Sequence, residues 1–115
     1  MWKIEMEPIK DWLTGLDRES KLQILAAVEV LKEQGPNLRR PLVGKIEGSK
    51  IKSMKELRPG SAGKSEIRIL FVFDPNRQAI MLVGGDKQNK WSKWYKTAIP
   101  EAEDRYEAWL KQNNK

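Results

Sequence analysis

Alternating apolar and polar residues in the middle of the chain predict three consecutive strands, at residues 54–58, 66–73 and 79–83. In the second strand, four apolar residues share one face: Ile67, Ile69, Phe71 and Phe73. The third strand is apolar on both faces, so we expect it to lie inside the sheet. These segments predict an antiparallel three-strand meander.

The residues before the meander predict a short strand followed by a helical hairpin. Residues 2–6 alternate as a strand does, and residues 9–16 are typical of a short amphipathic helix. Asp17 is an N-cap residue type for a longer helix that runs to about Gln34 and stops at the Gly-Pro pair that follows. The residues spaced for the buried face of this helix are Leu22, Leu25, Val28 and Leu31.

The end of the chain predicts a third helix over residues 97–112, with Pro100 in its first turn. Its apolar stripe consists of Ala102, Tyr106, Trp109 and Leu110. We expect this helix to cover Leu70 and Val72, which the hairpin cannot reach. The predicted class is α+β, in one domain over residues 1–115: an N-terminal strand and helical hairpin, the meander, and a C-terminal helix packed on the sheet.

Charged residues occur at regular positions in this predicted sheet. If Leu57 points toward the core with the Ile/Phe row, alternation places Glu56, Arg58 and Arg68 together on the other face. Guanidinium groups bind phosphate through two donors and stay charged at any useful pH. Two glycines after the third strand let the backbone turn and bring Lys87 to the rim of the same surface.

Composition favours an anionic partner and narrows the possible chemistry. The 115 residues carry a formal charge of +6 and a pI near 9.6, so nucleic acid is the commonest candidate partner. The sequence contains no cysteine and no histidine, which argues against disulfides, thiolate catalysis, a zinc centre and a histidine-based triad. We expect no metal and no cofactor. No apolar run is long enough to span a bilayer and no signal-peptide pattern occurs, so a cytoplasmic protein is expected.

Two basic segments adjoin the arginine face. Residues 37–52 are read as a loop rich in lysine and arginine, and residues 87–96 interleave four lysines with three aromatic residues, a combination that suits single-stranded RNA. The alternatives are a solvated loop and aromatic rings that pack on the sheet. The residues predicted to bind RNA are Arg39, Arg40, Lys45, Lys52, Lys55, Lys90, Lys93, Trp94 and Tyr95. Lys55 shares a face with Leu57 by alternation, so this prediction requires a bulge that redirects it.

Three motifs of the meander resemble those of a known family. They are ELR at 56–58, RILFVF at 68–73 and IMLVGGDK at 80–87, and two helices precede them and one follows in the order that the family uses. The chain is similar to the RelE/ParE superfamily, and most similar to the HigB-like, phage-associated branch of type II toxin–antitoxin systems. This resemblance implies an mRNA interferase: an endoribonuclease that cuts mRNA on the ribosome without a metal, using the 2′-hydroxyl as nucleophile. It also implies a cognate antitoxin.

This chemistry needs a group that accepts the hydroxyl proton, cations that stabilise the phosphorane, and a donor for the leaving oxygen. Arg58 and Arg68 suit the second task. Glu56 is the first candidate for the base, although it could merely neutralise an arginine. Lys87 could contact the scissile phosphate or donate a proton, and Tyr95 is an alternative acid. Two other functions stay open: a non-catalytic module that binds nucleic acid or protein, and a ParE-like gyrase poison.

Overall fold

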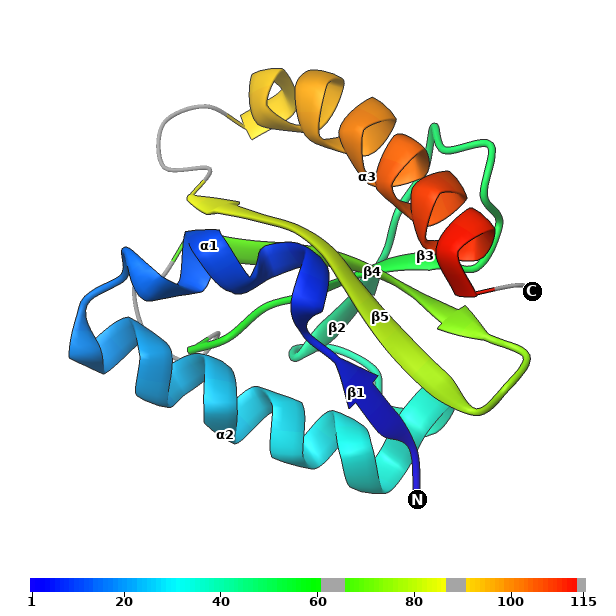
Figure 1. The fold of residues 1–115 in the computed structure, drawn as a ribbon. Helices are drawn as coiled ribbons and strands as arrows, with labels where there is room; N and C mark the ends of the chain where they lie inside the picture. The colour runs from blue at the N-terminus through cyan, green and yellow to red at the C-terminus, as the bar shows by residue number, and fades with distance from the viewer. Residues whose placement is uncertain (61–65, 87–90, 114–115) are drawn as a thin grey trace.

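The computed structural model describes residues 1–60, 66–86 and 91–113, and in these ranges a five-stranded mixed sheet lies between two helical layers (Figure 1). The strands are β1 (Lys3–Glu5), β2 (Val43–Lys45), β3 (Met54–Leu57), β4 (Ile67–Asp74) and β5 (Gln78–Asp86). The helices are α1 (Lys10–Thr14), α2 (Arg18–Gln34) and α3 (Trp91–Asn113), with 3₁₀ turns at Glu7–Ile9 and Gly35–Asn37. Figure 1 shows α1 and α2 on one face of the sheet and α3 on the other.

The predicted meander is confirmed as the antiparallel strands β3, β4 and β5. The strand order is β1-β5-β4-β3-β2, so β5 lies inside the sheet as expected, with β1 parallel to it at the edge. The prediction of a loop throughout residues 37–52 is wrong at β2, which pairs antiparallel with β3. A three-residue strand with glycine at its centre is too short to produce an alternation pattern, and it exists because β3 offers a partner edge.

The long helix of the hairpin begins and ends where its capping residues predict. The Asp17 carboxylate accepts hydrogen bonds from the Ser20 amide at 3.2 Å and the Ser20 hydroxyl at 2.7 Å, and Gly35 ends the helix with a φ of 55°. The predicted buried face is wrong in its first half, because Leu22 and Leu25 are 51% and 57% exposed. The buried residues are Ile24, Ala27, Val28 and Leu31. Repeated steps of three residues drift around a helix of 3.6 residues per turn, whereas the observed stripe follows the helical period.

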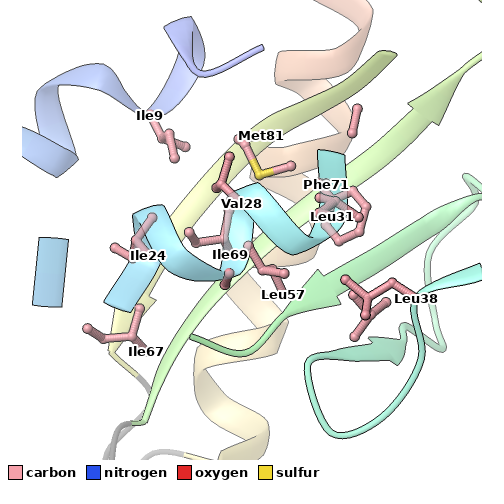
Figure 2. Packing of buried hydrophobic residues seen from close by; sticks show 13 residues of the cluster. Ile9, Ile24, Val28, Leu31, Leu38, Leu57, Ile67, Ile69, Phe71 and Met81 are labelled. Atoms are coloured by element: carbon pink, nitrogen blue, oxygen red, sulfur yellow. The ribbon is translucent and has the colours of Figure 1, made fainter. Parts of the chain in front are cut away.

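The first core lies between this hairpin and the sheet (Figure 2). In Figure 2, Val28 and Leu31 of α2 lie over Leu57, Ile69 and Phe71 of the strands. The face shared by Leu57 and the Ile/Phe row is therefore the one that alternation predicts, with Ile67, Ile69 and Phe71 buried and Phe73 packed partly exposed at its edge. Because side chains alternate along a strand, the residues between these core positions point to the opposite face, and Glu56 and Arg68 are among them.

α3 covers the opposite face and forms the second core with Leu70 and Val72, as predicted. The helix begins at Trp91, six residues before the predicted start, so the placement of Pro100 in the first turn is wrong and the proline lies inside the helix. Proline removes one backbone hydrogen bond from the helix interior. The turns on both sides of it bury side chains in the second core, Ala98 before and Ala102 after, and this packing holds the helix together across the missing bond.

A bulge in β5 changes which residues face each helical layer. Leu70 pairs with Val83 and Phe71 with Met81, so Leu82 is the extra residue. Beyond the bulge, Gly84 lies against the ring of Trp12 and Gly85 lies against the ring of Trp94, with no room for a Cβ atom at either glycine. The end of β5 therefore contacts both helical layers through backbone alone.

Candidate functional site

A buried carboxylate links two arginines and a tyrosine on the sheet face that α3 covers. The Glu56 side chain is 4% exposed, and its Oε2 accepts hydrogen bonds from Arg58 Nη2 at 2.8 Å and Nε at 3.1 Å. Its Oε1 accepts a hydrogen bond from the Tyr95 hydroxyl at 2.5 Å and lies 3.9 Å from Arg68 Nε. Each carboxylate oxygen therefore accepts at least one hydrogen bond, from Arg58 or from Tyr95, and Arg68 adds a second positive charge beside Oε1.

Strand register brings these residues together. Glu56 pairs with Leu70 of β4 on one side and with Gly44 of β2 on the other, and Arg58 follows directly after β3. A Cβ atom at residue 44 would lie 2.5 Å from Arg58 Nη2, so the guanidinium lies directly over the β2 backbone. Glycine at residue 44 is therefore what allows Arg58 to reach Glu56.

The two arginines differ in how their donors are used. The Arg68 side chain is 12% exposed; its Nη1 donates to the Ile67 carbonyl at 2.8 Å, and its Nη2 lies 3.9 Å from Glu66 Oε2. Among the residues that the structure describes, Arg68 Nε is buried and makes no hydrogen bond. Arg58 is instead joined to the carboxylate through two nitrogens and is 23% exposed. Arg68 therefore pairs with Glu56 through its charge alone, whereas Arg58 is hydrogen-bonded to the same carboxylate.

Tyr95 connects this cluster to the surface. Burial, followed by the hydrogen bond to Glu56 and the charge of that carboxylate, raises the pKa of Tyr95 well above its ordinary value. The side chain is therefore a neutral phenol that donates a hydrogen bond to Glu56 at any physiological pH. The Tyr95 ring also stands next to Trp94, with ring centroids 5.0 Å apart.

A groove of about 1040 Å³ runs along the β2 edge of the sheet, with Tyr95 in its wall. The side chains of α3 that line it are spaced as one helical stripe: Ser92, Tyr95, Lys96 and Ile99. Its cationic residues come from both walls: Arg39, Arg40, Lys45, Lys55 and Lys96. Glu47 is the carboxylate in this lining. Gly44, beneath the Arg58 guanidinium, lines the groove as well, so the buried cluster and the basic groove adjoin each other.

The structure brings only some of the predicted RNA-binding residues to this groove. Arg39, Arg40, Lys45, Lys55 and Tyr95 line it. Lys55 lines the groove without the bulge that alternation required, since the register between β3 and β4 is regular from Met54 to Leu57. It reaches the groove because the groove extends around the edge of the sheet. Lys52 and Lys93 are exposed outside the lining, and Trp94 packs on the second core. Lys87 and Lys90 lie outside the described residues.

Lys96 and Ser92 fall within the predicted RNA-binding segment 87–96, but they are not among the residues that the sequence analysis names for RNA binding. The signal was the spacing of Ser92, Tyr95, Lys96 and Ile99, which becomes visible only when the helix begins at Trp91. Within the described ranges, no three carboxylates gather as metal ligands would. None of the described helices has the length and apolar character needed to cross a membrane.

Known proteins share this fold and much of this sequence. A solved structure of a mutant of the E. coli toxin RelE in the free state matches with a TM-score of 0.55 and 15% identity, over 87% of this chain and 94% of that chain. Two Mycobacterium tuberculosis proteins named as candidate toxins are closer in sequence. HigB2 is 52% identical over 96% of this chain, and HigB3 is 47% identical over 93% of this chain and 91% of its own length. This chain spans 55% of the length of HigB2.

The chain therefore has a RelE-like fold and is related in sequence to HigB2 and HigB3. Residues 11–107 match the family described as Phage derived protein Gp49-like (DUF891), and the chain belongs to that family.

Proposed function

We propose that this chain is the toxin of a type II toxin–antitoxin system and that it cleaves mRNA on the ribosome. The observation that carries the proposal is the pair of guanidinium groups on Glu56, next to a groove lined by five cations. An extended RNA strand presents phosphates at regular intervals and unpaired bases that stack on aromatic rings. The groove offers cations on both walls and the Tyr95 ring in the α3 wall.

The proposed reaction is attack by the 2′-hydroxyl on the neighbouring phosphorus. The hydroxyl loses its proton, the new O–P bond forms, and the bond to the 5′-oxygen breaks as that oxygen takes up a proton. The products are a 2′,3′-cyclic phosphate and a free 5′-hydroxyl, so no water or redox partner is consumed. Arg58 and Arg68 would stabilise the additional negative charge of the phosphorane through their guanidinium charges.

The surroundings of Glu56 favour the second of its two predicted roles. A general base needs a free lone pair that the substrate can reach, whereas this side chain is 4% exposed and both of its oxygens accept hydrogen bonds or face a cation. We therefore propose that Glu56 positions Arg58 and Arg68. Lys87 stays the candidate for contact with the scissile phosphate or for proton transfer.

Relatives named as toxins support a cognate antitoxin as the protein partner, and the excess of cations in the groove would attract an acidic segment as readily as RNA. Toxin and antitoxin would act in the cytoplasm, where translating ribosomes are found. A non-catalytic module and a gyrase poison would use the same scaffold without cleaving RNA.

Primer extension on a reporter mRNA in a reconstituted translation system tests the proposal. The wild-type chain and Arg68→Ala would be compared with and without ribosomes. Arg18→Ala is the matched control, because Arg18 is exposed on α2, on the opposite side of the sheet. Discrete cuts are expected with wild type and Arg18→Ala, only on ribosomes, and loss of the cuts is expected with a folded Arg68→Ala protein. Absence of cuts by folded wild-type protein at saturating dose would refute the nuclease function.

A further inference from the structure

A carboxylate of α3 holds the connection between β2 and β3 by hydrogen bonds. Glu103 Oε2 accepts hydrogen bonds from the Ser49 hydroxyl and from the Lys50 amide, both at 2.8 Å. The Ser49 hydroxyl in turn accepts a hydrogen bond from the Ile51 amide at 3.0 Å. These two donors lower the pKa of Glu103, so the carboxylate stays ionised as an acceptor. The contact joins segments more than 50 residues apart.

This contact spans the two walls of the basic groove. One wall consists of β2 and the residues that follow it, including Lys45, Ile46 and Glu47. The other wall consists of the α3 stripe that ends at Ile99, and Glu103 is the next position of that stripe, four residues further along the helix. Glu103 therefore holds the strand wall at a set distance from the helix wall, one turn beyond the lined part of the groove.

The charge of Glu103 and its hydrogen bonds are expected to have opposite effects on the affinity of the groove for an anionic ligand. A carboxylate near the end of a phosphate-binding groove repels RNA, so its removal alone should strengthen binding. Its hydrogen bonds instead hold the connection that follows β2, and Lys45 is the last residue of this three-residue strand, so removing them should let the end of the strand shift away from Lys96 on the facing wall. The sign of the change in affinity therefore separates the two effects.

We propose that Glu103 is a positioning residue that sets the width of the groove, so that one RNA strand contacts Lys45 and Lys96 at the same time. This inference rests on the proposed function, because it takes single-stranded mRNA as the ligand. It concerns substrate affinity alone, since in the described part of the chain Glu103 makes no hydrogen bond or ion pair with Glu56, Arg58 or Arg68.

The test measures the cleavage rate against the concentration of mRNA-programmed ribosomes for Glu103→Ala, Glu103→Gln and Glu107→Ala. Glu107 is the matched control, because it is exposed on the same helix and its removal changes the charge equally. For Glu103→Ala, the half-saturating concentration should rise about fivefold with an unchanged maximal rate, as expected for the loss of two hydrogen bonds. Glu103→Gln keeps an acceptor oxygen but loses the charge, so its half-saturating concentration should be equal to or lower than that of wild type, and Glu107→Ala should likewise leave the concentration unchanged or lower it.

A second measurement does not depend on RNA. Hydrogen exchange of the Lys50 amide should become faster in Glu103→Ala and stay slow in Glu107→Ala. Ser49→Ala removes one of the two contacts from the strand wall and should weaken affinity in the same direction, which keeps the test decisive if Glu103→Ala does not fold. An unchanged or lower half-saturating concentration for folded Glu103→Ala would overturn this inference alone. Absence of cleavage by the wild type would overturn the proposed function and this inference with it.

Discussion

Replacing Glu56 with glutamine should lower the free energy of unfolding by about 3 kcal/mol, because it removes one partner of a buried ion pair. Glutamine keeps the volume of the side chain and can still accept the hydrogen bond from Tyr95. It leaves Arg58 and Arg68, with side chains only 23% and 12% exposed, without the charge that both face. For a domain of 115 residues, about 4 °C per kcal/mol gives a fall in Tm of about 12 °C.

The control is Glu66→Gln. Its Oε2 lies 3.9 Å from Arg68 Nη2, so this substitution also neutralises a carboxylate next to Arg68. Its side chain is 33% exposed, however, and exposed pairs of this kind contribute about 0–1 kcal/mol. Urea unfolding monitored by circular dichroism measures both variants. Equal losses for Glu56→Gln and Glu66→Gln would refute the reasoning, because burial and hydrogen bonding are what distinguish the two carboxylates.

The double variant Glu56→Gln with Arg58→Met gives a second check on the same pair. If Arg58 is destabilising once its carboxylate is gone, removing both partners should cost clearly less than the sum of the two single substitutions. Additive losses would show that Glu56 and Arg58 do not depend on one another.

Three further predictions follow from the structure. Gly44→Ala should reduce cleavage about tenfold and also lower the Tm, because the new Cβ displaces the end of Arg58 from the buried Glu56 carboxylate; primer extension and thermal melts measure the two effects. The raised pKa of Tyr95 means that its contribution to stability is present below pH 10.0 and is lost as pH rises through the raised value, so the urea midpoint of Tyr95→Phe should fall less steeply above pH 10.0 than that of wild type. Leu31→Ala should lower the free energy of unfolding by about 2–5 kcal/mol, whereas Leu25→Ala should change it by less than about 0.5 kcal/mol; similar losses would contradict the observed buried face of α2.

Local signals in the sequence predict the parts of the fold that neighbouring residues determine. Asp17 and Gly35 mark the two ends of α2 because capping depends on residues within one turn. Alternation in β4 assigns both faces of the sheet, and with them the common side of Glu56, Arg58 and Arg68, because successive side chains in a strand point in opposite directions.

Features that depend on distant partners were not visible in the sequence. β2 forms because β3 offers an edge, and α3 continues through Pro100 because Ala98 and Ala102 are buried on the sheet. The same limit applied to the site. Alternation placed Glu56 beside the arginines, but nothing local shows that Tyr95, 39 residues away, takes one of its two oxygens. The groove likewise combines β2, which no pattern revealed, with the first turns of α3.

The two glycines at the end of β5 restrict sliding of the hairpin and of α3 along the sheet. Trp12 of the hairpin and Trp94 of α3 rest on adjacent residues of one strand, Gly84 and Gly85, from opposite sides. Each indole lies against the backbone itself, so no side chain between them can change rotamer to absorb a shift. The hairpin and α3 are thereby fixed at the same position along β5, and neither can slide along that strand without bending it.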